Sequence, residues 1–172
     1  MLKMIGICMV FIGCSLTGIA IDLRYRRRVK ELEELIYALE CLKGEITYRL
    51  SPLQEACHTI GNQINPSVGA LFITFSNLLK QKEVDNIYEL WRQALKREAH
   101  HFHFNNEDYE MIYEFGRGLG YLDKKMQQAN IELFLNRLQN TLEKALKEQE
   151  KSSKLRTGMG VLIGVCISIL II

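Results

Sequence analysis

The sequence predicts an all-α protein: a membrane-anchored helical bundle of about six helices between two terminal transmembrane helices. Two apolar runs, at 4–21 and 157–172, contain no charged residue and are long enough for membrane helices. Between them, apolar residues recur at three- and four-residue spacing, which is typical of amphipathic helices. We see no clear polar–apolar alternation of the kind that indicates a strand. The chain therefore divides into residues 1–23, 24–156 and 157–172.

Residues 1–23 are predicted to form the N-terminal transmembrane helix. As a helix, the run at 4–21 extends over ~27 Å, close to the ~30 Å thickness of the hydrocarbon core of a bilayer. A cleavable signal peptide is the alternative, since Lys3 is a basic start and Gly18 and Ala20 resemble a small-residue cleavage site. The basic cluster that follows argues against this alternative, because translocation of such a cluster is disfavoured.

Basic residues flank both apolar runs on the sides that face the middle of the chain. The positive-inside rule therefore places residues 24–156 in the cytosol and both termini on the far side of the membrane. The same side chains are candidates for contacts with anionic lipid head groups, at ~1 kcal/mol per residue near the surface. These membrane-proximal basic residues are Arg24, Arg26, Arg27, Arg28, Lys154 and Arg156.

The first two helices of the central body follow from an apolar stripe and a capping signal. The stripe predicts a helix that runs from the N-terminal span to about Leu50. Ser51 and Pro52 supply an N-cap and a first-turn proline for a second, short helix. We expect this second helix to end at Gly61.

Capping residues mark the starts of the later helices. No proline or glycine lies between Gly120 and Gly158, so the sixth helix is expected to continue into the second apolar run. The expected starts are Asn65 with Pro66 for the third helix, Asp85 or Asn86 for the fourth, Asn105 or Asn106 for the fifth and Asp123 for the sixth. The apolar stripes predict core positions at Leu39, Phe72, Trp91, Phe115 and Leu138.

Residues 115–123, FGRGLGYLD, carry three closely spaced glycines. A dinucleotide or P-loop site needs a strand before its glycines, and the P-loop also needs a Lys-Ser/Thr pair. Here the preceding segment is helical and no such pair follows. Gly116 and Gly120 are four residues apart, a spacing that allows close approach of a neighbouring helix. Gly120 in a left-handed conformation and Asp123 as a cap would then make this segment a corner between two helices.

At this corner the chain resembles a known family. Residues 115–127, FGRGLGYLDKKMQ, are similar to the F-G-x-x-L-G-x-S-D-x-x-x-Q signature of the stage III sporulation protein AB family of spore-forming Firmicutes. Residues 39–56 and 87–95 are similar to two further segments, L-E-x-L-x-x-E-I-x-Y-x-x-T-P-L-x-E-A and W-x-x-A-L. Two positions depart from the pattern: Ser51 replaces a threonine, and Leu122 replaces the serine before the aspartate.

The resemblance implies a function as a non-enzymatic membrane adaptor. The family belongs to the complex that links mother cell and forespore, and its helical body is similar to the cytoplasmic domain of platform proteins in type II secretion and type IV pilus machines. This implies a mother-cell membrane location and docking of a cytosolic secretion-type ATPase, the stage III sporulation protein AA. Other membrane subunits of the complex and the lipid bilayer are further expected partners, whereas nucleic acid and a small-molecule substrate are not. The alternative is a membrane scaffold that assembles other subunits without contacting an ATPase.

The corner is our hypothesis for the partner-docking surface. Its candidate residues are Gly116, Arg117, Gly118, Gly120 and Asp123. Among them, Arg117 is expected to project from the turn and to contribute little to stability, because exposed charges rarely do.

No catalytic, cofactor-binding or metal-binding residue is predicted. His100, His101 and His103 form a small cluster, but a zinc site needs a fourth ligand and a supporting outer shell. We interpret them as histidines at a helix C-terminus. The acidic residues Glu31, Glu33 and Glu34 are interpreted as a solvated helix face, and no CxxC pair or disulfide framework is present.

Overall fold

The computed structural model describes the backbone of residues 2–81, 86–119 and 124–171, and the side chains of 22–81, 86–119 and 125–151. In these ranges the chain is all-helical, as expected. The α-helices are α1 Leu2–Gly44, α2 Leu53–Gln63, α3 Pro66–Gln81, α4 Ile87–Glu98, α5 Asn106–Phe115 and α6 Lys124–Ile171. Three short turns complete the described elements: a π-helical turn η1 Glu45–Arg49 and the 3-10 turns η2 Ala99–His101 and η3 Gly116–Gly118.

The chain divides into two compact units. One consists of residues 28–142, and the other of residues 1–27 together with 143–172. Among the residues searched, which are the described ones, no helix combines the length and the apolar character needed to cross a membrane. The side chains of the two predicted spans, at 4–21 and 157–172, lie outside the described residues.

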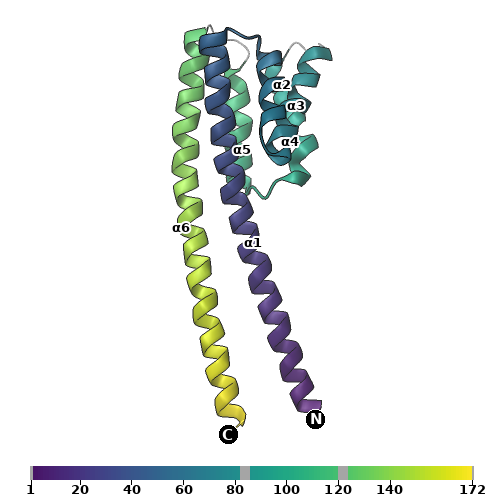
Figure 1. The fold of residues 1–172 in the computed structure, drawn as a ribbon, viewed down its shortest axis with the longest axis vertical. Helices are drawn as coiled ribbons and strands as arrows, with labels where there is room; N and C mark the ends of the chain where they lie inside the picture. Colours follow the sequence, from purple (N-terminus) through teal and green to yellow (C-terminus); the bar gives the residue numbers. More distant parts are fainter. Residues whose placement is uncertain (1, 82–85, 120–123, 172) are drawn as a thin grey trace. The chain divides into compact units, whose positions relative to one another are not determined.

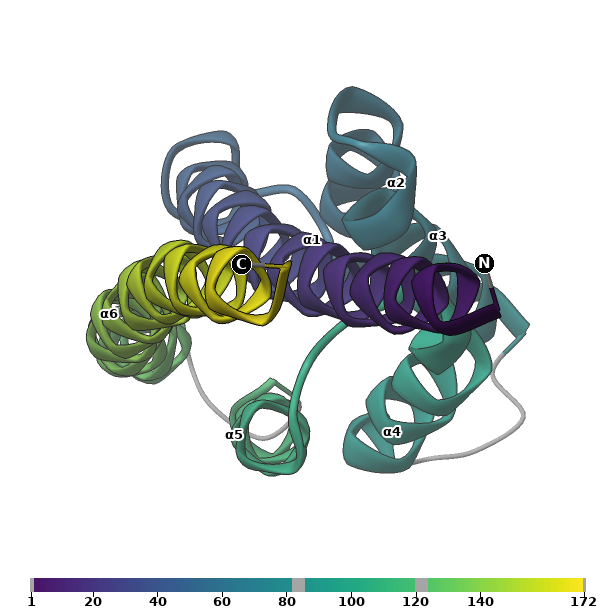
Figure 2. The ribbon, with the colours of Figure 1, turned by 90° about the horizontal axis from the view of Figure 1, so that it is seen from below.

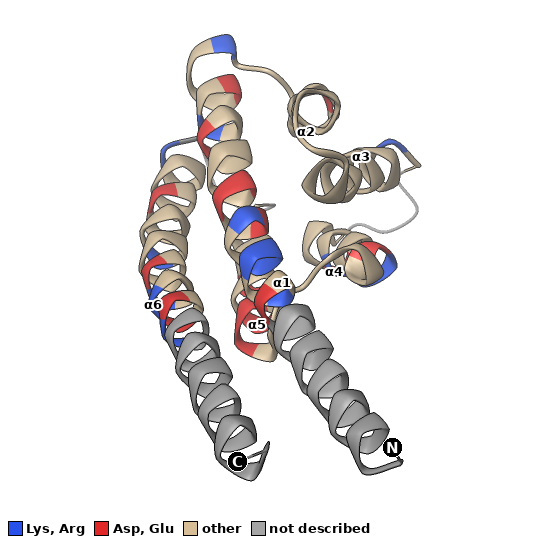
Figure 3. Cartoon of the chain, turned by 60° about the horizontal axis from the view of Figure 1, so that its bottom comes forward, with Lys and Arg blue, Asp and Glu red and all other residues tan. Residues whose placement is uncertain are grey.

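Within residues 28–142 the helices form two groups of three. Helices α2, α3 and α4 pack beside one another, and the 28–44 part of α1 lies beside α5 and the first part of α6 (Figures 1 and 2). Helices α2 and α3 each carry a single Lys, Arg, Asp or Glu, at Glu55 and Lys80, whereas charged residues are frequent along α1 and α6 (Figure 3). Helices α2 and α3 therefore contribute little charge to the surface of the bundle.

Trp91 of α4 lies at the centre of the core. Its ring makes edge contacts with Phe72 and Phe75 of α3, with centroids 5.9 and 5.0 Å away, and with Phe115 of α5 at 5.6 Å. Its indole N–H donates to the carbonyl oxygen of Ile112 at 2.8 Å, so the buried polar atom is satisfied. All five predicted core residues are buried, which confirms that prediction: Leu39, Phe72, Trp91, Phe115 and Leu138.

The prediction that Gly61 ends the second helix is wrong. Helix α2 continues through Gly61 to Gln63. A Cβ on Gly61 would lie 2.9 Å from the carbonyl oxygen of Gly69, and a Cβ on Gly69 would lie 2.5 Å from that of Gly61. The two glycines therefore allow α2 and α3 to approach closely, and the requirement at Gly61 is for space and not for a helix end.

Two of the predicted caps are confirmed. The side chain of Asn86 accepts from the backbone N–H of Tyr88 at the start of α4. Asn105 accepts from the N–H of Asp108, whose carboxylate accepts from the N–H of Asn105 in turn, which makes a reciprocal capping box at the start of α5.

The predicted cap at Ser51 is wrong. Helix α2 is preceded by Pro52 as its N-cap, without a side-chain hydrogen bond, and the hydroxyl of Ser51 instead donates to the Glu45 carboxylate at 3.0 Å. The π-helical turn η1 ends at Leu50 with a φ of 55°, a left-handed conformation that bends the chain toward α2. The turn thus uses Ser51 to close itself, so Ser51 is not available to cap the next helix.

Candidate functional site

The glycine-rich corner lies between α5 and α6. Helix α5 ends at Phe115, and η3 continues the chain through Gly118 to Leu119, which is buried. The side-chain amide of Gln127 in the first part of α6 donates to the carbonyl oxygen of Leu119 at 3.1 Å. Two of the predicted docking residues, Gly120 and Asp123, lie outside the described residues.

Gly116 is buried against the core. A Cβ at this position would lie 2.5 Å from Cδ1 of Trp91, closer than side-chain carbons approach. The residue itself has an ordinary right-handed helical conformation, with a φ of −57°. Gly116 is therefore needed for the close approach of η3 to α4, and it presents no side chain to a partner.

Gly118 plays a comparable part toward α6. The side-chain amide of Asn130 occupies the space in which a Cβ of Gly118 would lie. No described glycine has a positive φ, so at Gly116 and Gly118 the requirement is for space and not for backbone freedom. The left-handed residue expected at Gly120 lies outside the described residues.

Arg117 is the exposed side chain of this corner. Its guanidinium carbon lies 5.4 Å from the centroid of the Tyr88 ring in α4, which is a cation–π contact. Among the described residues, no carboxylate forms an ion pair with Arg117. The corner therefore presents an arginine that an aromatic ring holds in place and that no described acid neutralises.

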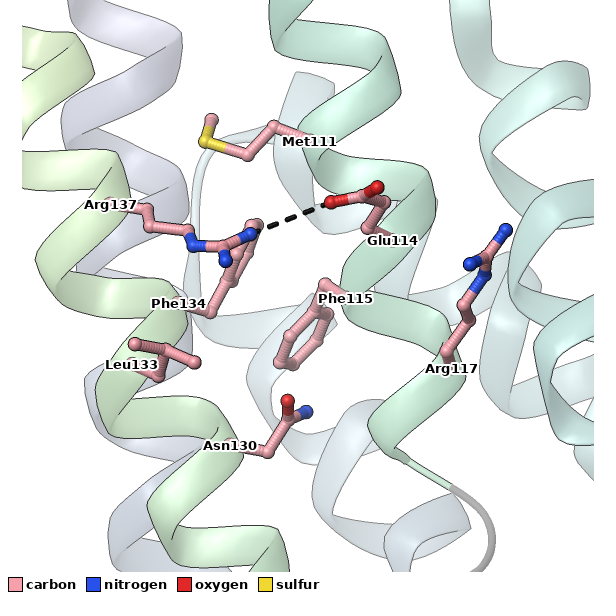
Figure 4. Close-up of a pocket in the computed structure, with 8 residues that line it drawn as sticks. All are labelled: Met111, Glu114, Phe115, Arg117, Asn130, Leu133, Phe134 and Arg137. Carbon is pink, nitrogen blue, oxygen red and sulfur yellow. Dashed lines mark hydrogen bonds and ion pairs between the residues drawn. The ribbon is translucent and has the colours of Figure 1, made fainter.

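A pocket of about 260 Å³ lies at the corner, between α5 and α6, and Arg117 is one of the residues that line it (Figure 4). The rings of Phe115 and Phe134 stack there with centroids 4.4 Å apart. Leu133 and Met111 complete the apolar lining, and Leu133 is 55% exposed. Phe115 also contacts Trp91, so the aromatic lining of the pocket is continuous with the aromatic core.

Arg117 also lines this pocket, but its side chain lies apart from the other charged pair of the lining. Arg137 of α6 reaches across the pocket toward Glu114 of α5, with an N–O distance of 3.5 Å, and both side chains are more than half exposed. Figure 4 shows that the Arg117 side chain points away from this pair, on the opposite side of the α5–η3 segment. The two arginines of the lining thus differ in their contacts, since Arg117 lies over the ring of Tyr88 and Arg137 pairs with Glu114.

The basic cluster that begins the central body is not uniformly exposed, which corrects the prediction for Arg28. Arg28 is buried and donates to both carboxylate oxygens of Asp108, at 2.7 and 3.1 Å. It is therefore a structural residue and not a lipid-facing one. Arg24 is exposed, and the exposed Arg26 pairs with Asp22 one turn earlier at 2.8 Å.

Three predicted basic residues remain. The side chain of Arg27 is among the described ones and is exposed. The side chains of Lys154 and Arg156 lie outside the described residues.

The interpretation of Glu31 as part of a solvated face is also wrong. Glu31 is buried, accepts from the backbone N–H of His103 at 2.7 Å and lies 2.7 Å from its Nδ1. Burial of a carboxylate requires such partners, and here they come from a segment 72 residues later in the sequence. No local pattern in the sequence indicates this contact. The capping box differs in this respect, because Asn105 and Asp108 are only three residues apart.

The histidines do not converge on one point. His100 contacts the carbonyl oxygen of Arg97 at the end of α4, as expected for a histidine at a helix C-terminus, and His101 lies 3.6 Å from Glu98. His103 instead pairs with Glu31. Among the described residues, no group of three or more His, Cys, Asp or Glu side chains is arranged to hold a metal ion.

Burial raises the pKa of several weak acids in this unit. The free thiol of Cys57 in α2 is fully buried, and the loss of hydration raises its pKa above the ordinary value of 9.0. Burial is also the largest cause that raises the pKa values of Tyr109 and Tyr113 in α5. These groups stay protonated and neutral at physiological pH, so the exposed charge of the corner comes from its arginines and glutamates.

Comparisons with known proteins agree with the resemblance seen at the corner. The profile of the stage III sporulation protein AB family matches residues 3–172. The stage III sporulation protein AB of Bacillus subtilis (strain 168) is 31% identical over 171 residues, which cover 99% of each chain. A solved structure of a stage III sporulation protein AB superposes with a TM-score of 0.68 at 30% identity, and covers 73% of this chain and 98% of that chain. The chain therefore belongs to the stage III sporulation protein AB family.

Proposed function

We propose that this protein is a non-enzymatic membrane adaptor of the complex that links mother cell and forespore, and that it docks a cytosolic secretion-type ATPase. The observation that carries the proposal is the family match over residues 3–172. The likeness of the family's helical body to platform proteins of secretion and pilus machines supports the docking role. The exposed Arg117, which lies within the family signature, supplies a surface on which docking can occur.

Membrane attachment is part of this proposal. It rests on the two uncharged runs and on the basic residues beside them. Arg28 is not counted among the lipid-facing residues, because it is buried in an ion pair with Asp108. Single cysteines introduced at His58 and near either terminus of a cysteine-free chain test it with a membrane-impermeant thiol reagent. We expect a terminal cysteine to label in intact cells and the cysteine at residue 58, an exposed position, to label only after lysis. The reverse pattern would rule out a cytosolic body.

Binding of the ATPase is tested with the purified full chain. The chain, in detergent micelles or lipid nanodiscs, is immobilised and the stage III sporulation protein AA is titrated over it with and without ATP. We expect saturable binding. If a chain with normal helical circular dichroism does not bind the ATPase in either condition, the adaptor function is wrong.

The alternative of a scaffold predicts a different outcome of the same experiment. A scaffold copurifies with other membrane subunits of the complex from sporulating cells but does not bind the isolated ATPase. Copurification of both kinds of partner supports the adaptor, whereas subunits without the ATPase support the scaffold.

A further inference from the structure

We propose that Arg117, positioned by the ring of Tyr88, is a receptor for a carboxylate on an acidic segment of the partner protein. This inference rests on the proposed docking function and specifies the chemistry and the face of that site. Its structural basis is the contact between an exposed guanidinium on η3 and an aromatic ring on α4.

The position of the guanidinium is set by residues that the core holds in place. Tyr88 lies in the first turn of α4, where its backbone N–H donates to the Asn86 cap at 3.0 Å. Gly116, which precedes Arg117 in η3, is packed against Trp91, and Trp91 lies in α4 as Tyr88 does. Both ends of the contact are thus anchored, and Arg117 loses little side-chain freedom when it binds a partner.

The chemistry of Arg117 favours a carboxylate as its ligand. A guanidinium stacked on a ring through its face keeps its N–H edge available, and that edge matches the two oxygens of a carboxylate. No described acid forms an ion pair with Arg117, so no intramolecular pair has to be broken first. Arginine and tyrosine are also the residue types that concentrate binding energy in protein interfaces.

The neighbouring surface extends this site. Arg92 lies one turn after Tyr88 on α4, and its ion pair with Glu89 has a long N–O distance of 3.8 Å. Tyr113 of α5 is half-buried and lies within electrostatic reach of Arg92, Glu110 and Tyr88. Two guanidinium groups and two tyrosine rings from α4, α5 and η3 therefore occupy one region, which suits an acidic segment with an apolar or aromatic residue.

Arg137, which lines the same pocket as Arg117 but does not contact Tyr88, provides a matched control. Arg137 is also exposed and also lies beside the corner, but it pairs with Glu114 and points into the pocket between α5 and α6 (Figure 4). Arg117→Glu and Arg137→Glu change the net charge equally. Only the first is expected to disrupt docking, because only Arg117 lies over the Tyr88 ring, whereas Arg137 already has a carboxylate partner in Glu114.

The test measures ATPase binding to the full chain and to four variants whose thermal unfolding is checked first. We expect Arg117→Glu to weaken binding by at least about thirtyfold and to flatten its dependence on salt, because the loss of a charge pair and the new repulsion add. Tyr88→Ala is expected to weaken binding about threefold to tenfold, and Tyr88→Phe to restore it, since the phenyl face is retained. Arg137→Glu is expected to bind within about twofold of the wild type.

A second probe separates this inference from the ATPase assignment. A fluorescein-labelled peptide of serine and glycine that carries one Glu-Leu-Glu triplet is titrated with the full chain, beside a peptide in which both glutamates are lysine. We expect the acidic peptide to bind weakly and to lose binding in Arg117→Glu but not in Arg137→Glu. If the ATPase does not bind but this peptide pattern is found, the adaptor function fails and the carboxylate receptor stands.

Other outcomes overturn the inference. ATPase binding that is unchanged in a stably folded Arg117→Glu variant shows that docking occurs elsewhere, although the adaptor function then survives. A larger loss in Arg137→Glu than in Arg117→Glu places docking around Arg137 instead. Equal losses in Tyr88→Ala and Tyr88→Phe show that the ring does not position the arginine.

Discussion

The two buried regions that join distant helices in residues 28–142 differ in how they are held together. Around Trp91, four aromatic rings from α3, α4 and α5 meet edge to face, and one hydrogen bond satisfies the indole N–H. Near the start of the unit, α1 is joined to the η2–α5 segment by polar groups: Arg28 forms an ion pair with Asp108, and Glu31 is hydrogen-bonded to His103. The first region is apolar, whereas the second, the ionic region, contains the buried ion pair of Arg28 and Asp108.

Because of this difference, the two regions should respond differently to amino-acid substitutions. Apolar contacts contribute stability in proportion to the area they remove from water, so truncation costs free energy through lost area and the cavity that remains. A buried ion pair contributes little net stability, because desolvation offsets attraction, yet removal of one partner leaves a buried charge. The ionic region should therefore be more sensitive to single substitutions than to paired ones.

Truncation of the aromatic centre should have the largest effect. We expect Trp91→Ala to lower the free energy of unfolding by about 3 to 5 kcal/mol, because the ring is fully buried and contacts three others. Trp91→Phe keeps much of the volume and serves as the control, with a smaller loss. Denaturant unfolding followed by circular dichroism measures both. An unchanged midpoint in Trp91→Ala would show that the ring does not hold the core together.

The ionic region should break when only one partner is removed. Asp108→Ala is expected to cost about 3 kcal/mol, because Arg28 stays buried without its carboxylate and α5 loses its capping box. The double variant Arg28→Met with Asp108→Leu removes both charges, so it should be more stable than Asp108→Ala alone. The same unfolding assay compares them. A double variant less stable than Asp108→Ala would mean that the pair itself contributes net stability.

The two glycines of the corner allow a finer comparison between apolar and polar neighbours. Gly116→Ala is expected to cost about 1 to 3 kcal/mol, because the new methyl group meets the buried Trp91 ring. Gly118→Ala should cost less, since its neighbour is the end of the Asn130 side chain, which can rotate away. Asn130→Ala combined with Gly118→Ala should recover the loss. If Gly118→Ala lowers the stability as much as Gly116→Ala does, the Asn130 side chain cannot rotate away from the new methyl group, and the prediction is wrong.

The smallest effect concerns pH. Burial raises the pKa of Cys57 in the folded state above its ordinary value of 9.0, so the stability linked to this thiol is fully present below pH 9.0 and is lost as pH rises. We expect a loss of about 1 kcal/mol for the first pH unit above that value. Thermal unfolding across this range measures it, with Cys57→Ala as the reference. A reference variant with the same alkaline loss would assign the effect to other groups, such as Tyr109, whose pKa burial also raises.

The helical class, two of the helix caps and the core stripe could be predicted from the amino-acid sequence. Asn86 and Asn105 act as caps because capping is an interaction within one turn of the chain, and Trp91 and Phe115 are buried because helical periodicity places them on inward faces. The family signature at the corner is likewise local. Each of these features depends on residues a few positions apart, so a pattern in the chain is enough to predict them.

Which charged and small residues have a structural role became clear only from the packed fold. Arg28 and Glu31 have the composition of an exposed helix face, but their partners lie 80 and 72 residues away, and no local pattern predicts such contacts. Gly61 was expected to end a helix, yet its role is set by the backbone of Gly69 packed against it. Close approach of a neighbouring helix was expected at Gly116, but the structure was needed to show that the ring of Trp91 packs there. The contact of Arg117 with Tyr88 likewise could not be predicted from the sequence, because η3 meets α4 only after the bundle has packed.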